Sequence, residues 1–128
     1  MEDVKIKISA LWVAGMLNGL MGAVLELFEP DILEQMIAGE VGGIQITSEM
    51  LLFMAILMVI PPIMVFLTLT LKDKANRWAN IIFGIVFVGF GLVELIEKIA
   101  QPYFVVLGIV GVVFSVMIVW YAWKWKKD

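Results

Sequence analysis

The sequence contains no cysteine and no histidine. Without cysteine, the chain cannot form disulfides, carry out thiol redox chemistry or bind metals through thiolates. Without histidine, it lacks the most common general base and a frequent metal ligand. The remaining carboxylates form no recognisable catalytic pattern. We therefore predict no catalytic residue, no metal and no cofactor, and we expect a function other than catalysis.

Charged residues are also scarce, at 16% of the chain against 62% hydrophobic residues. The apolar residues form four long runs, and about 20 apolar helical residues are enough to cross a bilayer. This pattern predicts an all-α membrane protein with a single domain (1–128), a bundle of four transmembrane helices. The spans are predicted at about 8–28, 49–71, 79–100 and 103–123. The first run is too long for the apolar core of a signal peptide, so we expect it to be retained.

Basic residues are nearly absent from one of the two sides that these spans define. Only Lys98 lies there, and the other eight basic residues lie on the opposite side. The positive-inside rule then predicts a multi-pass protein of the plasma membrane, with both termini and the 72–77 loop in the cytoplasm. The tryptophans lie towards the same side and suit an aromatic belt. Four residues are predicted to contact lipid headgroups there: Lys72, Lys74, Arg77 and Trp78.

The longest connection, residues 29–48, lies between spans one and two on the outer side. Pro30 suits the first turn of a helix, and Gly39 suits the residue just past its end. Four apolar residues between them share one helical face: Ile32, Leu33, Met36 and Ile37. We predict a short amphipathic helix that lies on the outer leaflet or over the end of the bundle, as a cover or as a gating lid. Residues 41–44 are predicted to form a flexible return.

Small residues occupy one face of span one at steps of four and three, followed by an acid: Gly15, Gly19, Gly22 and Glu26. Span three carries a similar face: Gly84, Phe87, Gly91, Glu94 and Lys98. We predict that Gly19 and Gly22 face Gly91. Two interpretations remain open. The two smooth faces pack closely together, or the missing side chains leave a cavity for a lipid tail or a small apolar molecule.

Glu94 is the most deeply placed ionisable residue, about 22 Å along span three from Ala79. A charge within the bilayer core is costly and is usually paired or functional. Lys98 follows Glu94 at a spacing that favours an ion pair. Glu26 is predicted to lie at the same depth as Lys98, so the three side chains are expected to meet. Either a structural ion pair or a site for protons or cations is consistent with this pattern.

Two adjacent prolines, Pro61 and Pro62, lie near the middle of span two. They remove the donors for the carbonyls of Leu57 and Met58, so the span is predicted to kink there. Asn18, near the middle of span one, is predicted to donate hydrogen bonds to the freed carbonyls. This contact would be structural, or part of an ion or substrate site at the membrane midplane.

Five stretches of the chain resemble a family of small prokaryotic four-span membrane proteins of unknown function (DUF6326). They are KISALW (7–12), GIQIT (43–47), AILM (55–58), KANRWANII (74–82) and WYAWKW (120–125). The resemblance covers nearly the whole chain, and its most specific part is the ANRWAN run. It implies a four-span fold and supplies no activity.

Two functions of different classes fit the sequence. The first is a small binding or accessory bundle that holds a lipid-like or apolar small molecule, or a partner helix. The alternative is a minimal oligomeric transporter or channel for protons or small cations, which uses Glu94 and an acidic outer mouth. The expected partners are membrane lipids and a second copy in a homodimer, and nucleic acid is not expected. The candidate ligand or ion site comprises seven residues: Asn18, Gly19, Gly22, Glu26, Gly91, Glu94 and Lys98.

Overall fold

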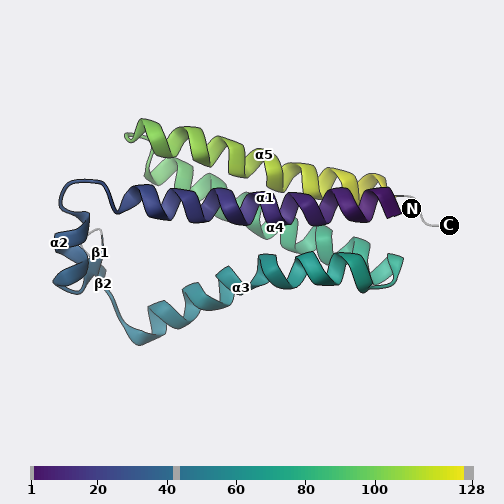
Figure 1. The fold of residues 1–128 in the computed structure, drawn as a ribbon, viewed down its shortest axis with the longest axis horizontal. Helices are drawn as coiled ribbons and strands as arrows, with labels where there is room; N and C mark the ends of the chain where they lie inside the picture. Colours follow the sequence, from purple (N-terminus) through teal and green to yellow (C-terminus); the bar gives the residue numbers. More distant parts are fainter. Residues whose placement is uncertain (1, 42–43, 126–128) are drawn as a thin grey trace.

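Four long helices form a bundle in the computed structural model, which describes residues 2–41 and 44–125 (Figure 1). They are α1 (Glu2–Glu26), α3 (Ser48–Thr70), α4 (Asp73–Glu97) and α5 (Pro102–Lys124). Each is long and apolar enough to cross a membrane. The predicted all-α membrane bundle with four spans is therefore confirmed. Lys126, Lys127 and the Gly42–Gly43 part of the predicted return lie outside the described residues.

One end of the bundle, which we call the terminal end, carries the start of α1, the end of α5 and the α3–α4 connection (Figure 1). We call the opposite end the loop end. Helix α4 begins at Asp73, so the predicted 72–77 loop is wrong and most of it is helical. An acid in the first turn stabilises a helix start. The hydropathy pattern misses this extension because polar residues near a membrane surface can be helical without being apolar.

The loop end carries α2 (Ile32–Ile37), which confirms the predicted short helix between the first two spans. Gly39 follows it with a φ of 83°, a conformation that favours glycine. Two short strands, β1 (Glu40–Val41) and β2 (Ile44–Gln45), then pair antiparallel, which the sequence did not predict. No residue of α2 is buried, so this helix does not seal the end of the bundle.

Helix α5 packs against both α1 and α4, and α1 also packs against α3. Three glycines lie against α5, namely Gly22 of α1 and both Gly84 and Gly91 of α4. A Cβ added at Gly22 would lie 3.6 Å from Leu107, and one added at Gly91 would lie 2.9 Å from Val112. The prediction that Gly19 and Gly22 face Gly91 is wrong, because side chains of α5 lie against Gly22 and Gly91, and a Cβ added at Gly19 would meet nothing within 4 Å.

Helix α3 bends near its middle (Figure 1). Pro61 and Pro62 lie inside the helix, where a proline ring clashes with the preceding turn and removes a hydrogen bond. The predicted bend is confirmed. The first half of α3 stands apart from the bundle (Figure 1). The three buried residues of α3 all lie from the bend onwards: Pro61, Met64 and Thr68.

Asn18 does not serve the prolines of α3. Its Nδ2 donates a hydrogen bond of 2.9 Å to the carbonyl oxygen of Leu107 on α5. The prediction of an Asn18 contact with α3 is therefore wrong. The reason is the same as for the glycines: α5 is the neighbour of this face of α1.

Candidate functional site

The face of α1 that points into the bundle changes character along the helix. Residues at steps of four and three share one helical face, here Ile8, Trp12, Gly15, Gly19, Gly22 and Glu26. Ile8 and Trp12 are only 0% and 3% exposed. A Cβ added at Gly15 or Gly19 would meet nothing within 4 Å. This face is thus packed near the terminal end and meets open space at Gly15 and Gly19.

Helix α4 has a corresponding face with the same spacing: Asn76, Asn80, Phe83, Phe87, Phe90 and Glu94. Asn76 and Asn80 are fully buried near the terminal end. Phe87 packs edge-on against Trp12, with their ring centroids 5.6 Å apart. Phe90 is 40% exposed, and Glu94 is also exposed. The face of α4 therefore opens in the same half of the bundle as the face of α1.

The bend of α3 accounts for this opening. From Pro61 onwards α3 covers the faces of α1 and α4. Ser9 Oγ on α1, for example, donates a 3.1 Å hydrogen bond to the carbonyl oxygen of Val65 on α3. The first half of α3 diverges from the bundle (Figure 1), and the two faces are exposed there at Gly19, Phe90 and Glu94. We call this region the open half, meaning the α1 face at Gly15 and Gly19 and the α4 face at Phe90 and Glu94.

An ion pair borders the open half at the loop end. Lys98 Nζ lies 2.7 Å from Glu26 Oε2, which confirms the prediction that these side chains meet. Lys98 Nζ also lies 4.6 Å from the centroid of the Phe104 ring. Among the described residues, no group of three or more carboxylates is arranged to hold a metal ion.

Glu94 is not part of this ion pair. Within the described part of the chain, Lys98 forms an ion pair with Glu26 and none with Glu94, so the predicted Glu94–Lys98 pair is wrong. Lys98 is the C-cap residue, directly after the last residue of α4, and its N–H still donates to the Glu94 carbonyl oxygen at 3.0 Å. The backbone keeps the helical spacing there, but the Lys98 ammonium pairs with Glu26 on α1 instead of Glu94.

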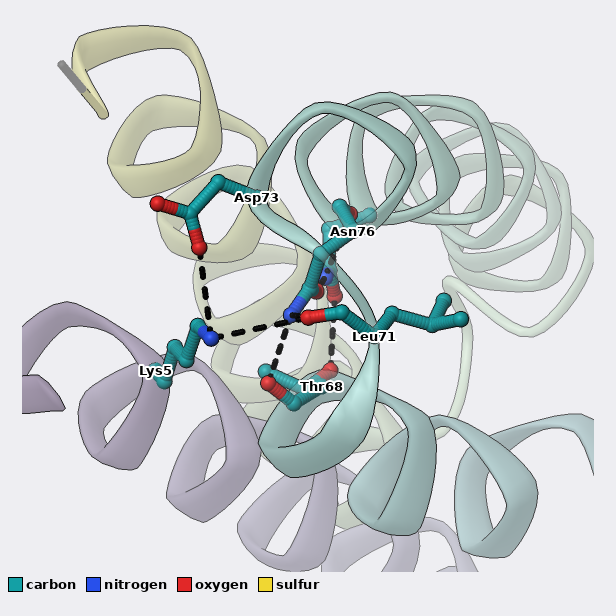
Figure 2. Close-up of polar contacts among 6 residues, drawn as sticks. Lys5, Thr68, Leu71, Asp73 and Asn76 are labelled. Atoms are coloured by element: carbon teal, nitrogen blue, oxygen red, sulfur yellow. Dashed lines mark hydrogen bonds and ion pairs between the residues drawn. The ribbon is translucent and has the colours of Figure 1, made fainter. Parts of the chain in front are cut away.

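Four buried side chains border the open half on the side of the terminal end, and Figure 2 labels two of them, Thr68 and Asn76. We call them the amide cluster: Trp12, Thr68, Asn76 and Asn80. Asn80 Oδ1 accepts from Trp12 Nε1 at 2.7 Å and from Thr68 Oγ1 at 3.3 Å. Asn76 Nδ2 donates to the Thr68 carbonyl oxygen at 2.6 Å, and Asn80 Nδ2 donates to Asn76 Oδ1 at 2.7 Å. These bonds join α1, α3 and α4.

The sequence pattern does not reveal the amide cluster. Trp12 suits an aromatic belt by its position in the sequence, whereas it is buried in the core. Asn76 falls in the predicted 72–77 loop, and Asn80 falls at the start of the predicted third span. Once α4 is extended to Asp73, their spacing of four puts both amides on one helical face, which is the signal that would have identified the cluster.

Two further basic residues hold the terminal end together. Lys5 Nζ lies 3.2 Å from Asp73 Oδ1 and donates to the Leu71 carbonyl oxygen at 3.5 Å (Figure 2). Arg77 donates to the carbonyl oxygens of Ala122 and Trp123 at the end of α5, at 2.9 and 3.1 Å. These contacts are structural. The predicted headgroup contacts of Lys72, Lys74, Arg77 and Trp78 stay a prediction.

The four apolar helices define a small membrane helical bundle. The whole chain, residues 1–128, matches the model of a family of unknown function (DUF6326), and the chain belongs to this family. The resemblance drawn from the sequence is thereby confirmed. No curated protein and no solved structure matches the chain.

Proposed function

We propose that this protein is a small membrane binding protein that holds a lipid-like, apolar molecule in the open half. One observation carries the proposal: the inward face of α1 has glycine at Gly15 and Gly19, and a Cβ added at either position would meet nothing within 4 Å. Glycine in a helix costs about 1 kcal/mol relative to alanine. The glycines therefore destabilise α1 without allowing another helix to pack against Gly15 and Gly19. This cost is consistent with a ligand that needs the space beside them.

The surroundings of these glycines favour an amphiphile. Phe90 and the exposed apolar residues of the first half of α3 supply apolar surface. The Glu26–Lys98 pair and Glu94 supply polar groups at the loop end. We infer that the apolar part of the ligand lies beside Gly15 and Gly19, and that its polar part lies near these charges.

Replacing Gly19 with leucine is expected to abolish ligand retention and to leave the fold stable. The new side chain would occupy the open half, and leucine is about 1 kcal/mol more favourable than glycine in a helix. The ligand would be measured by solvent extraction and mass spectrometry of the purified protein. Binding of a fluorescent fatty acid in detergent would be measured in parallel.

Gly89→Leu is the matched control. A Cβ added at Gly89 also meets nothing within 4 Å, but Gly89 does not lie on the inward face of α4. We expect this variant to bind the probe as the wild type does. Equal binding by the wild type and Gly19→Leu would refute the proposed function, and so would an equal loss in both variants.

The alternative function, an oligomeric transporter or channel for protons or small cations, is favoured by one observation. Glu94 lies on the inward face of α4 without an ion pair among the described residues. A homodimer would be needed to enclose a pathway around it. Flux of protons or potassium into proteoliposomes that is lost in Glu94→Gln would favour this alternative over binding.

We further propose that the terminal end faces the cytoplasm and that the protein resides in the plasma membrane. Six described basic residues near the terminal end support this orientation: Lys5, Lys7, Lys72, Lys74, Arg77 and Lys124. Because the chain has no cysteine, single cysteines report position cleanly. In intact cells, a membrane-impermeant maleimide should label Glu34→Cys and should not label Lys74→Cys. The reverse result would invert the orientation.

A further inference from the structure

A second apolar feature lies on the other side of the bundle, between α4 and α5. It is a groove of about 390 Å³, lined by apolar and aromatic side chains: Ile85, Val88, Val116, Val119, Trp120 and Trp123. The helical spacing puts Ile85 and Val88 off the inward face of α4 that carries Asn80 and Glu94. The groove is therefore separate from the open half.

Two cations lie beside the tryptophans of this groove, near the terminal end. Lys124 Nζ is 5.6 Å from the centroid of the Trp120 ring. The guanidinium carbon of Arg77 is 5.7 Å from the centroid of the Trp123 ring. Stacking on an aromatic ring holds such a cation in place by cation–π attraction. The groove thus combines an apolar length with a positively charged end.

Arg77 retains capacity to bind an anion. Its Nε donates to the Ala122 carbonyl oxygen, and one terminal nitrogen donates to the Trp123 carbonyl oxygen. A guanidinium has five N–H donors, and among the described residues the other terminal nitrogen of Arg77 has no acceptor. Arginine in this geometry suits a phosphate group, which offers several oxygens.

We propose that this groove binds one anionic phospholipid from the leaflet at the terminal end. An acyl chain lies along the apolar lining, and the phosphate lies between Arg77 and Lys124. Charge complementarity selects this occupant. A neutral apolar helix would leave both cations without a counter-charge, and an anionic lipid carries the acyl chain and the negative charge in one molecule. Tryptophan is enriched at the membrane–water interface, so Trp120 and Trp123 suit the depth at which the lipid phosphate would lie.

The test compares two exposed lysines of the terminal end. The protein would be incubated with equimolar phosphatidylglycerol and phosphatidylcholine in mixed micelles, and retained lipid would be counted by native mass spectrometry. The wild type is expected to retain phosphatidylglycerol in preference to phosphatidylcholine. Lys124→Gln should weaken this retention about fivefold, the usual contribution of one basic residue at an anionic surface. Lys74→Gln should change it little, because Lys74 does not lie beside the groove tryptophans.

A second pair of variants tests the groove itself. Val116 lines the groove and is 47% exposed, so Val116→Trp should fill the groove without strain and remove the bound lipid. Val106→Trp, at a position that is 62% exposed and outside the groove, is the control and should retain the lipid. Circular dichroism and gel filtration would confirm folding.

Three results would overturn the proposal: an equal loss in the two lysine variants, retention in Val116→Trp, or equal retention of both lipids by the wild type. Gly19→Leu distinguishes this site from the open half. It is expected to leave phosphatidylglycerol retention unchanged, and a loss in this variant would also overturn a separate groove site.

Discussion

Replacing Asn80 with alanine is expected to destabilise the protein by about 2–4 kcal/mol, the largest effect that we predict for a single substitution. The Asn80 amide joins three helices through Trp12 on α1, Thr68 on α3 and Asn76 on α4. It is fully buried, so alanine would leave the Trp12 N–H and the Thr68 hydroxyl without their partner. A buried polar group without a partner costs about 1–3 kcal/mol.

A double-mutant cycle isolates this contact. The unfolding free energy would be measured by steric trapping in bicelles for Asn80→Ala, Trp12→Phe and the double variant. We expect a coupling of about 0.5–2 kcal/mol, because each single change removes the same hydrogen bond. Thr70→Val is the control. The Thr70 hydroxyl donates to the carbonyl oxygen of Phe66 at an exposed position, so its loss should cost little. Additive effects of the two core changes would contradict the structure.

Replacing Lys98 with methionine is expected to lower the unfolding free energy by about 1–3 kcal/mol. The Lys98 and Glu26 side chains are 28% and 21% exposed, so their ion pair is only partly screened by solvent. Methionine keeps the apolar stem beside Phe104 but leaves the Glu26 carboxylate without its counter-charge. The estimate is below the cost of breaking a fully buried pair because both side chains remain partly exposed.

Removing the opposing charge should reverse most of this loss. Glu26→Gln in the Lys98→Met background is expected to recover most of the stability, whereas Glu26→Gln alone should destabilise. Lys74→Met serves as a control for losing a lysine at an exposed position. If Lys98→Met and Lys74→Met had the same effect, the ion pair would have no stabilising role.

Much of the fold could be predicted from the sequence. The four spans, the short helix between spans one and two and the bend at Pro61 and Pro62 all followed from local patterns. The meeting of Glu26 and Lys98 also followed, because two parallel helices with known starting points place these residues at the same depth. Each of these predictions depends on residues close in sequence, or on the distance along a helix.

The contacts of the candidate site were less predictable. The spacing of Glu94 and Lys98 predicts an ion pair between them, but the Lys98 ammonium pairs with Glu26 on a different helix. Asn18 was assigned to α3, but it binds α5. The amide cluster was missed because hydropathy does not detect the polar first turns of a helix.

The sequence by itself determined the four-span membrane fold and the position of the bend, because hydropathy and proline act within a few residues. Only the tertiary structure decided that α5 packs against both glycine-bearing helices, α1 and α4, and that α3 covers one half of the bundle and leaves the other open. A glycine face is equally smooth towards any helix, so its neighbour depends on how all four helices fit together. The same fit decides that Gly15 and Gly19 meet open space, whereas Gly22 and Gly91 are packed.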